Sequence, residues 1–192
     1  MTNKGTGAGG SRTNLNGKRF ENDTTIKEIL RNQNYTFINI NNNCFFYKKV
    51  LDDKTIIFLY QTNFKNYMKY KYGLGCIRNP DEVCIIEYKS GKKILRILEK
   101  KYQNVNGSVE TKLWGGPSLK REYEILYPDF EVEYAYCVND FLQDKICSSV
   151  IKWKIFNKIM LENSINIFYG KDNNYKEQVY NWFIGEFDNI LT

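Results

Sequence analysis

The chain has 192 residues, enough for one domain with a substantial core, and it contains no histidine. The lack of histidine excludes His-dependent nuclease chemistry, Ser-His-Asp catalysis and histidine-ligated zinc, which leaves acid–base or metal chemistry to carboxylates, Lys, Tyr and Cys. The formal net charge of +6 suits a polyanionic partner without identifying one.

Cysteine usage and hydropathy predict the compartment. The five cysteines are an odd number and none of them has C-x-x-C spacing, so buried reduced thiols in a cytoplasmic protein are the simplest interpretation. The first sixteen residues lack the apolar core of a signal peptide, and no apolar run approaches the roughly 18 residues of a membrane span. We expect a cytoplasmic protein without a membrane partner.

The N-terminus is rich in Gly, Asn and Thr, so residues 1–16 have the composition of a flexible arm, and residues 17–192 are expected to form a single domain. The arm does not match a phosphate-cradling loop, because Arg12 stands where the first glycine is needed and Arg19 where Ser or Thr is needed. Arg12, Lys18 and Arg19 are instead candidates for contacts with DNA backbone phosphates.

Hydrophobic periodicity predicts a helix over residues 17–33, then three short strands, then a helix over 63–72 that interleaves Lys with aromatic residues. That second helix could bind nucleic acid through phosphate contacts and base stacking. The other interpretation, which is the more common case, is an amphipathic helix with its aromatic side chains inside and its lysines in solvent. The three strands are expected at residues 35–40, 44–51 and 56–61.

The most informative stretch is a predicted hairpin. Two apolar runs, residues 83–88 and 94–98, flank the turn dipeptide Ser90-Gly91. If the turn is centred on that dipeptide, the residue numbers of two paired residues add up to about 181. Asp81 would then lie opposite Lys100.

Glu99, Lys101 and Gln103 project from one face of the second strand, because residues two apart share a face. Asp81 and Glu99 at the open end of the hairpin could hold Mg²⁺, a hard ion that takes oxygen ligands, and Lys101 could orient the attacking water. We prefer this set to Asp81, Glu87 and Lys89, because six residues of one strand span roughly 20 Å.

The remainder of the chain predicts alternating helices and strands. Ser108 and Ser118 are candidate N-caps of two short helices, and residues 130–138 are a clearly alternating strand. A helix over 141–162, a strand over 165–169 and a helix over 175–187 complete an α/β core with a mixed sheet. Three cations on the short helices, Lys112, Lys120 and Arg121, are further candidates to bind DNA.

The motif P-D, strand, turn, E-x-K resembles the signature of the restriction-endonuclease-like PD-(D/E)xK nucleases. The string E-K-K-Y-Q-N-V-N-G-S-V-E-T-K-L resembles a type II restriction endonuclease branch, and the likeness covers residues 78–126. The resemblance implies a restriction-endonuclease-like mixed sheet flanked by helices on both faces. It also implies that Asp81 and Glu99 bind the metal, that Lys101 assists the water and that Gln103 is a neighbouring ligand or orienting group.

A second string, G-G-S-R-T-N-L-N-G-K-R-F-E, resembles an N-terminal motif of the same branch. This resemblance implies that Glu21 opens the first helix and points at the metal site. The other interpretation is an ordinary carboxylate in the first turn of a helix, where it interacts favourably with the dipole.

Together these features predict a Mg²⁺-dependent endonuclease of double-stranded DNA, of the site-specific type II restriction class. The resemblance also implies a homodimer and a cognate DNA methyltransferase. Two alternatives remain: a structure-specific repair or recombination nuclease of the same fold, and a non-catalytic nucleic-acid-binding protein.

Overall fold

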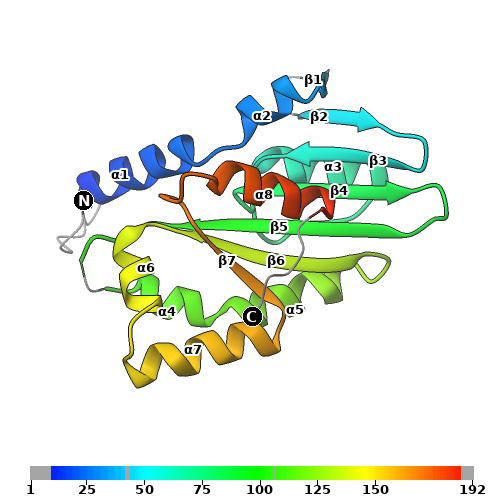
Figure 1. Cartoon of the computed structure of the whole chain (residues 1–192). Coiled ribbons are helices and arrows are strands. Elements are labelled where there is room, and N and C mark those ends of the chain that lie inside the picture. The colour runs from blue at the N-terminus through cyan, green and yellow to red at the C-terminus, as the bar shows by residue number, and fades with distance from the viewer. Residues whose placement is uncertain (1–9, 42–43, 106, 187–192) are drawn as a thin grey trace, which may run out of the picture.

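One mixed sheet organises the computed structural model, which describes residues 10–41, 44–105 and 107–186. Within these ranges the seven strands lie side by side in their order along the chain (Figure 1). The first five strands pair antiparallel, whereas β5, β6 and β7 run parallel. The strands are β1 (Thr36–Asn41), β2 (Cys44–Val50), β3 (Lys54–Leu59), β4 (Glu82–Tyr88), β5 (Lys93–Lys101), β6 (Glu131–Val138) and β7 (Ile165–Tyr169).

Helices cover both faces of the sheet. One core cluster joins the sheet to α3 through α7, including both crossover segments that the parallel strands require. A second cluster joins the opposite face to α1, α2 and α8, and Figure 1 shows α8 in front of the sheet and α3 behind it. The helices are α1 (Gly10–Asp23), α2 (Lys27–Asn32), α3 (Thr62–Tyr72), α4 (Val109–Trp114), α5 (Gly116–Leu126), α6 (Asp140–Ile146), α7 (Ile151–Glu162) and α8 (Tyr175–Ile184).

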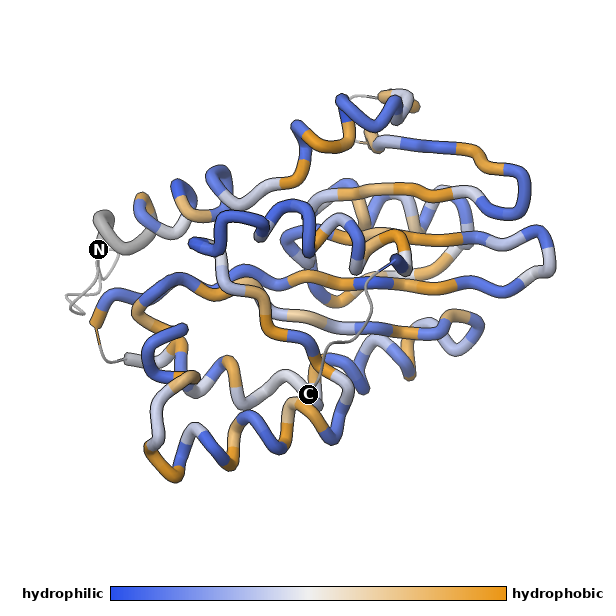
Figure 2. The backbone as a smooth tube through the Cα atoms, in the orientation of Figure 1, coloured by the Kyte–Doolittle hydropathy of each residue, from blue (hydrophilic) through white to orange (hydrophobic). Residues whose placement is uncertain are grey.

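This arrangement confirms the expected mixed α/β sheet flanked by helices. β6 illustrates why: Tyr134 and Tyr136 face one core cluster while Ala135 and Cys137 face the other, so a strand buried on both sides is apolar almost throughout. Figure 2 shows the same distribution, with hydrophobic stretches along the strands and hydrophilic turns between them. Within the described residues no helix has the length and apolar character needed to cross a membrane.

The hairpin between β4 and β5 forms as predicted, but its turn has three residues rather than two. Tyr88 donates its backbone N–H to Lys92 O (2.9 Å), and Gly91 donates to Tyr88 O (3.0 Å). Gly91 has φ +92, the left-handed conformation that a three-residue hairpin loop places at its last position. Ser90 is therefore the middle of the loop and not the first of two turn residues.

The extra loop residue shifts the pairing by one position. Glu82 pairs with Leu98, whereas a two-residue turn would pair it with Glu99. Because a shift of one residue exchanges the faces of a strand, the predicted register would have put Asp81 on the same face as Lys100. The observed register puts Asp81 on the face of Glu99, as the proposed chemistry requires.

The predicted helix over residues 17–33 is two helices, α1 and α2. Thr24 donates its hydroxyl to Phe20 O (2.6 Å), and its own N–H bonds to the same carbonyl. Threonine side chains that bond to the preceding turn weaken helix continuation, so the chain leaves the helix there.

The predicted arm over residues 1–16 is corrected for residues 10–16, which belong to α1. The remaining residues of that arm, 1–9, lie outside the described residues. Because α1 begins at Gly10, Glu21 lies in the last turn of this helix. The resemblance had implied the first turn.

The predicted helix over residues 141–162 is also divided, into α6 and α7. Ser148 donates its hydroxyl to Lys145 O (2.6 Å), and Asn157 donates its side-chain amide to Ile146 O (2.9 Å). Both contacts satisfy carbonyls at the end of α6 and so stabilise the break.

Two further helix boundaries differ from prediction. α5 begins at Gly116, so Ser118 lies inside the helix and is not its N-cap, because Pro117 fits the first turn of a helix. α8 ends at a left-handed Gly185 (φ +83), and the predicted end at Phe187 lies outside the described residues.

Helix α3 has the amphipathic form. Phe64, Tyr67 and Met68 are buried, whereas Lys65 and Lys69 are exposed. Phe64 and Tyr67 are therefore core residues and cannot serve as stacking platforms for bases.

The cysteines are free thiols, as expected. Cys44, Cys84 and Cys137 are buried, Cys76 is half-buried and Cys147 is exposed. Burial raises the pKa of Cys84 and Cys137 above the ordinary thiol value, so these two thiols stay protonated and unreactive.

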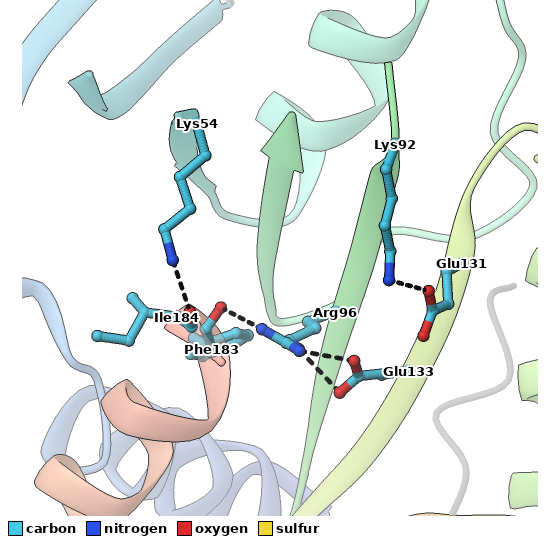
Figure 3. Close-up of polar contacts among 7 residues, drawn as sticks. All are labelled: Lys54, Lys92, Arg96, Glu131, Glu133, Phe183 and Ile184. Atoms are coloured by element: carbon cyan, nitrogen blue, oxygen red, sulfur yellow. Dashed lines mark hydrogen bonds and ion pairs between the residues drawn. The ribbon is translucent and has the colours of Figure 1, made fainter. Parts of the chain in front are cut away.

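A buried cation on β5 fixes α8 to the sheet (Figure 3). The Arg96 guanidinium donates to both carboxylate oxygens of Glu133 on β6 (2.8 and 2.6 Å) and to Phe183 O at the end of α8 (3.1 Å). Lys54 donates to Ile184 O (3.5 Å) in the same turn. Two cations thus bind the carbonyl end of α8, where the helix dipole favours positive charge.

We expect Arg96→Met to lower the free energy of unfolding by about 2–3 kcal/mol, because it leaves the half-buried Glu133 carboxylate without its partner. The matched control is Lys92→Met. Lys92, immediately before β5, pairs with Glu131 at the start of β6, but both side chains are more than half exposed, so no measurable change is expected. Urea denaturation measures both variants, and equal losses would contradict the assignment.

Candidate catalytic and metal-binding site

The end of β5 presents an acidic and a basic side chain on one face. Glu99 and Lys101 follow Leu95 and Ile97, which belong to the core cluster of that face. Lys101 Nζ donates to Glu99 Oε2 at 2.7 Å, and the two side chains are 20% and 16% exposed. The pair is shielded from bulk water yet reachable from the surface.

Asp81 lies next to this pair, immediately before β4. Its Oδ2 accepts a hydrogen bond from the backbone N–H of Lys100 at 2.7 Å. This bond joins the beginning of β4 to the end of β5 beyond the last ladder pair. The carboxylate is therefore held at the open end of the hairpin, as the sequence predicted.

The charges at this end of the sheet act on one another. Burial raises the pKa of Glu99 above its ordinary value; the Lys101 ammonium opposes this rise and the Asp81 carboxylate adds to it. The negative charges of Asp81 and Glu99 therefore lie close enough to repel each other in a poorly solvated place. A cation between them would relieve that repulsion.

Glu21 is brought to the same place from the last turn of α1. Burial raises the pKa of Glu21, and the Asp81 carboxylate raises it further, against the lowering effect of Lys100, Lys101 and Lys18. Glu21 therefore lies within electrostatic range of Asp81, and its expected role at a metal site stays a prediction. Its expected place in the first turn was wrong, and at the last turn an anion interacts unfavourably with the helix dipole.

Gln103 is tied to the loop that follows β5. Its backbone N–H and C=O bond to the side chain of Asn139 (3.1 and 2.8 Å), and its side-chain amide donates to Val105 O. Gln103 Oε1 is buried and has no hydrogen-bond partner among the described residues. Within those residues the structure records no contact from Gln103 to Asp81 or Glu99.

Arg78 is a residue that the sequence did not single out. Its guanidinium binds Glu122 of α5 through two bonds, Nε to Oε1 (2.8 Å) and Nη2 to Oε2 (3.1 Å). Its positive charge also lowers the pKa of Glu99. Its position three residues before Asp81 was the available signal, but the partner on α5 could not be identified without the fold.

Two buried tyrosines lie close to Glu99. Burial and then the Glu99 charge raise the pKa of both Tyr123 and Tyr134, so their hydroxyls stay protonated. Both hydroxyls are buried. The sequence identified these residues only as apolar members of a helix and a strand, because hydropathy patterns do not show where a hydroxyl points.

Three of the predicted DNA-binding cations already bind acceptors of the chain itself. Each has an acceptor within the chain. These contacts are Arg19 Nε to Asp23 Oδ2 (3.6 Å), Lys120 Nζ to Asn163 O (2.9 Å) and Arg121 Nη1 to Glu124 Oε2 (2.9 Å).

Lys18 and Lys112 are exposed, and Lys18 acts electrostatically on Glu21. Arg12 lies in α1, but its side chain is outside the described part of the chain. Lys18 is thus a predicted phosphate contact whose charge acts on an acidic residue of the site.

The donor set fits a hard divalent cation held by two carboxylates. No group of three or more His, Cys, Asp or Glu side chains within the described residues is close enough to hold a metal ion, so Glu21 does not complete a three-carboxylate cluster. Mg²⁺ is commonly held by one or two carboxylates together with waters and substrate phosphate. Asp81 and Glu99 meet that requirement, and their mutual repulsion is what such an ion would offset.

Comparisons with family models, curated proteins and solved structures find no match to this chain. The proposed function therefore depends on the residues at the end of the hairpin.

The raised pKa of Glu99 predicts a pH-dependent stability in the absence of divalent ions. The folded protein holds this proton more tightly than the unfolded chain, so the stabilisation is complete below the ordinary pKa of 4.5 and is lost as the pH rises through the native value. We expect Glu99→Gln to unfold at higher urea concentration than the wild type at about pH 8, and the difference to vanish at or below about pH 4.5.

The exposed Glu162, which pairs only loosely with Lys158 (3.9 Å), supplies the control variant Glu162→Gln. It should follow the wild-type pH profile in EDTA. Identical pH profiles for Glu99→Gln and the wild type would contradict the electrostatic description of the site.

Proposed function

We propose that this protein is a Mg²⁺-dependent endonuclease that hydrolyses phosphodiester bonds of double-stranded DNA, in the manner of site-specific type II restriction endonucleases. The observation that carries the proposal is the Glu99–Lys101 pair beside Asp81, at the open end of a hairpin. The uncatalysed phosphodiester is so inert that the site must lower the barrier by on the order of 20 kcal/mol.

Lys101 has the central role among the side chains. An ammonium carries three N–H donors, and the bond to Glu99 Oε2 uses one of them. The remaining donors can hold the attacking water and a non-bridging phosphate oxygen, and the positive charge offsets the negative charge that builds up on the phosphate. Glu99 therefore fixes the direction in which Lys101 donates.

Asp81 and Glu99 would hold the Mg²⁺, which when bound lowers the pKa of a water ligand and so supplies a nucleophile near neutral pH. Attack on phosphorus in line with the O3′ leaving group gives 5′-phosphate and 3′-hydroxyl ends. Glu21 adds negative charge from α1 and favours retention of a cation there.

The formal charge of +6 and the exposed Lys18 and Lys112 suit contacts with the DNA backbone. Two copies of the chain would be needed to cut both strands at one site, and a restriction enzyme would be accompanied by a methyltransferase that protects the same sequence. These partners are part of the proposal.

The test is cleavage of supercoiled plasmid in Mg²⁺. Asp81→Asn and Glu99→Gln should each reduce the rate about 10³-fold or more, because loss of a cation ligand forfeits several kcal/mol of transition-state stabilisation. Lys101→Met should reduce it about 10²–10³-fold. Binding to the same DNA, measured by fluorescence anisotropy, should persist in all three variants.

Glu87→Gln is the matched control, because Glu87 is a carboxylate on the same hairpin that binds Lys71 and Tyr72 at the opposite end of β4. Cleavage by this variant should equal that of the wild type, and discrete fragments would identify site-specific cutting. If Glu87→Gln abolishes cleavage while Glu99→Gln does not, the site has been assigned to the wrong residues.

A further inference from the structure

Lys100 stands between Glu99 and Lys101 in the sequence, but its side chain lies on the opposite face of the sheet. Lys100 Nζ is 2.8 Å from Glu82 Oε1 of β4, and the two side chains are 2% and 3% exposed. The same ammonium donates to the backbone carbonyl of Glu21 at 3.0 Å. Its own backbone N–H donates to Asp81 Oδ2. One residue therefore contacts two acidic residues of the candidate site.

A buried ion pair of this kind contributes little net stability to a fold. The desolvation of both charges offsets most of their attraction, and well-packed apolar side chains are often as stable or better. Glu82 Oε2 is moreover buried without a partner among the described residues. A structural purpose alone would be met equally well by two apolar residues, so the contact to Glu21 is the informative one.

The Glu21 carbonyl belongs to the last turn of α1, where backbone carbonyls lack helical partners. α1 has no basic residue of its own in that turn, and Lys100 supplies the cation from the sheet. The Glu21 carboxylate, whose charge interacts with that of Asp81, is thus held by the helix end that Lys100 binds.

We propose that the Lys100–Glu82 pair positions Glu21 by binding the last turn of α1, and so completes the acidic environment in which Asp81 and Glu99 would hold the divalent cation. This proposal rests on the proposed metal-dependent function. Lys100 is a positioning residue: it acts on the cation site through Glu21 and through its backbone bond to Asp81.

β5 contains a second pair of the same construction, which serves as the matched control. Arg96 lies on the same face of the same strand, binds Glu133 on the neighbouring strand and binds Phe183 O at the end of α8. The Arg96–Glu133 pair anchors a helix that contributes no acidic residue to the candidate site. Removal of either pair takes away one buried ion pair and one contact to the carbonyl end of a helix. Only the Lys100 pair contacts Glu21.

The experiment compares Lys100→Met/Glu82→Leu with Arg96→Met/Glu133→Leu, since replacing both members of a pair leaves no unpaired charge. Mn²⁺ binding to the full chain without DNA is measured by calorimetry. The Lys100 double variant should bind Mn²⁺ about 10–100-fold more weakly, the usual effect of removing a partner outside the ligand set. The Arg96 double variant should bind as the wild type does.

A thermodynamic cycle with Glu21→Gln separates positioning from general loosening. If Lys100 acts through Glu21, the loss of Mn²⁺ affinity in the Lys100 double variant should be much smaller when Glu21→Gln is already present. Hydrogen exchange at the Thr24 amide, which bonds to Phe20 O at the end of α1, should also be faster in the Lys100 double variant. If the double variant cannot be purified, Lys100→Gln is tested in the same cycle.

The proposal is overturned if the folded Lys100 variant shows unchanged Mn²⁺ affinity and unchanged Thr24 exchange, if both double variants lose affinity equally, or if the effects with Glu21→Gln are simply additive. Failure of the proposed function gives a different result, since the wild type would then bind no Mn²⁺. In that case the Thr24 exchange rate still decides whether Lys100 holds α1.

Discussion

The hydrogen bond from the Lys100 backbone N–H to Asp81 Oδ2 is the contact on which the candidate site depends. It joins the two strand ends beyond the last ladder pair and fixes a carboxylate there. Strand alternation then sends Glu99 and Lys101 to one face and Lys100 to the other. The candidate site and the contact to α1 therefore lie on opposite faces of a single strand, on neighbouring residues.

Three ion pairs involve residues of β5. Arg96 and Lys100 are buried cations on one face, each with a carboxylate on an adjacent strand and each bound to the carbonyl end of a helix. Glu99 and Lys101 form a third pair on the other face. The first two pairs bind α8 and α1 to the sheet, while the third is partly exposed, so the same strand carries both structural contacts and the candidate site.

The acidic groups are held at a cost to stability. Burial and repulsion from the Asp81 carboxylate raise the pKa of Glu99 and of Glu21, which means that their charged forms are destabilised in the folded protein. Sites that store such unfavourable charge are common where a protein binds a cation or carries out acid–base chemistry. Structural ion pairs also shift pKa values, so the arrangement of Asp81, Glu99 and Lys101, and not the shifts alone, supports the proposed function.

The hairpin and its acidic pair were predictable, because a Ser-Gly turn between two apolar runs is a local signal. The register was wrong by one residue, because the sequence does not show whether Gly91 is the second or the third residue of the loop. Glu21 was assigned to the wrong end of its helix, because the Gly and Asn residues before Gly17 indicated a flexible arm, whereas the helix begins at Gly10. The Lys100–Glu82 pair was missed, although charged residues within apolar strands at positions of the buried face were a usable signal.

The central claim is that Asp81 and Glu99 share a cation. The most direct measurement is an anomalous difference map from a crystal of the protein soaked in Mn²⁺. We predict one strong peak in contact with a carboxylate oxygen of each residue, at about 2–2.3 Å. A saturated soak with no peak between these two side chains, or with a peak only at other carboxylates, would contradict the account.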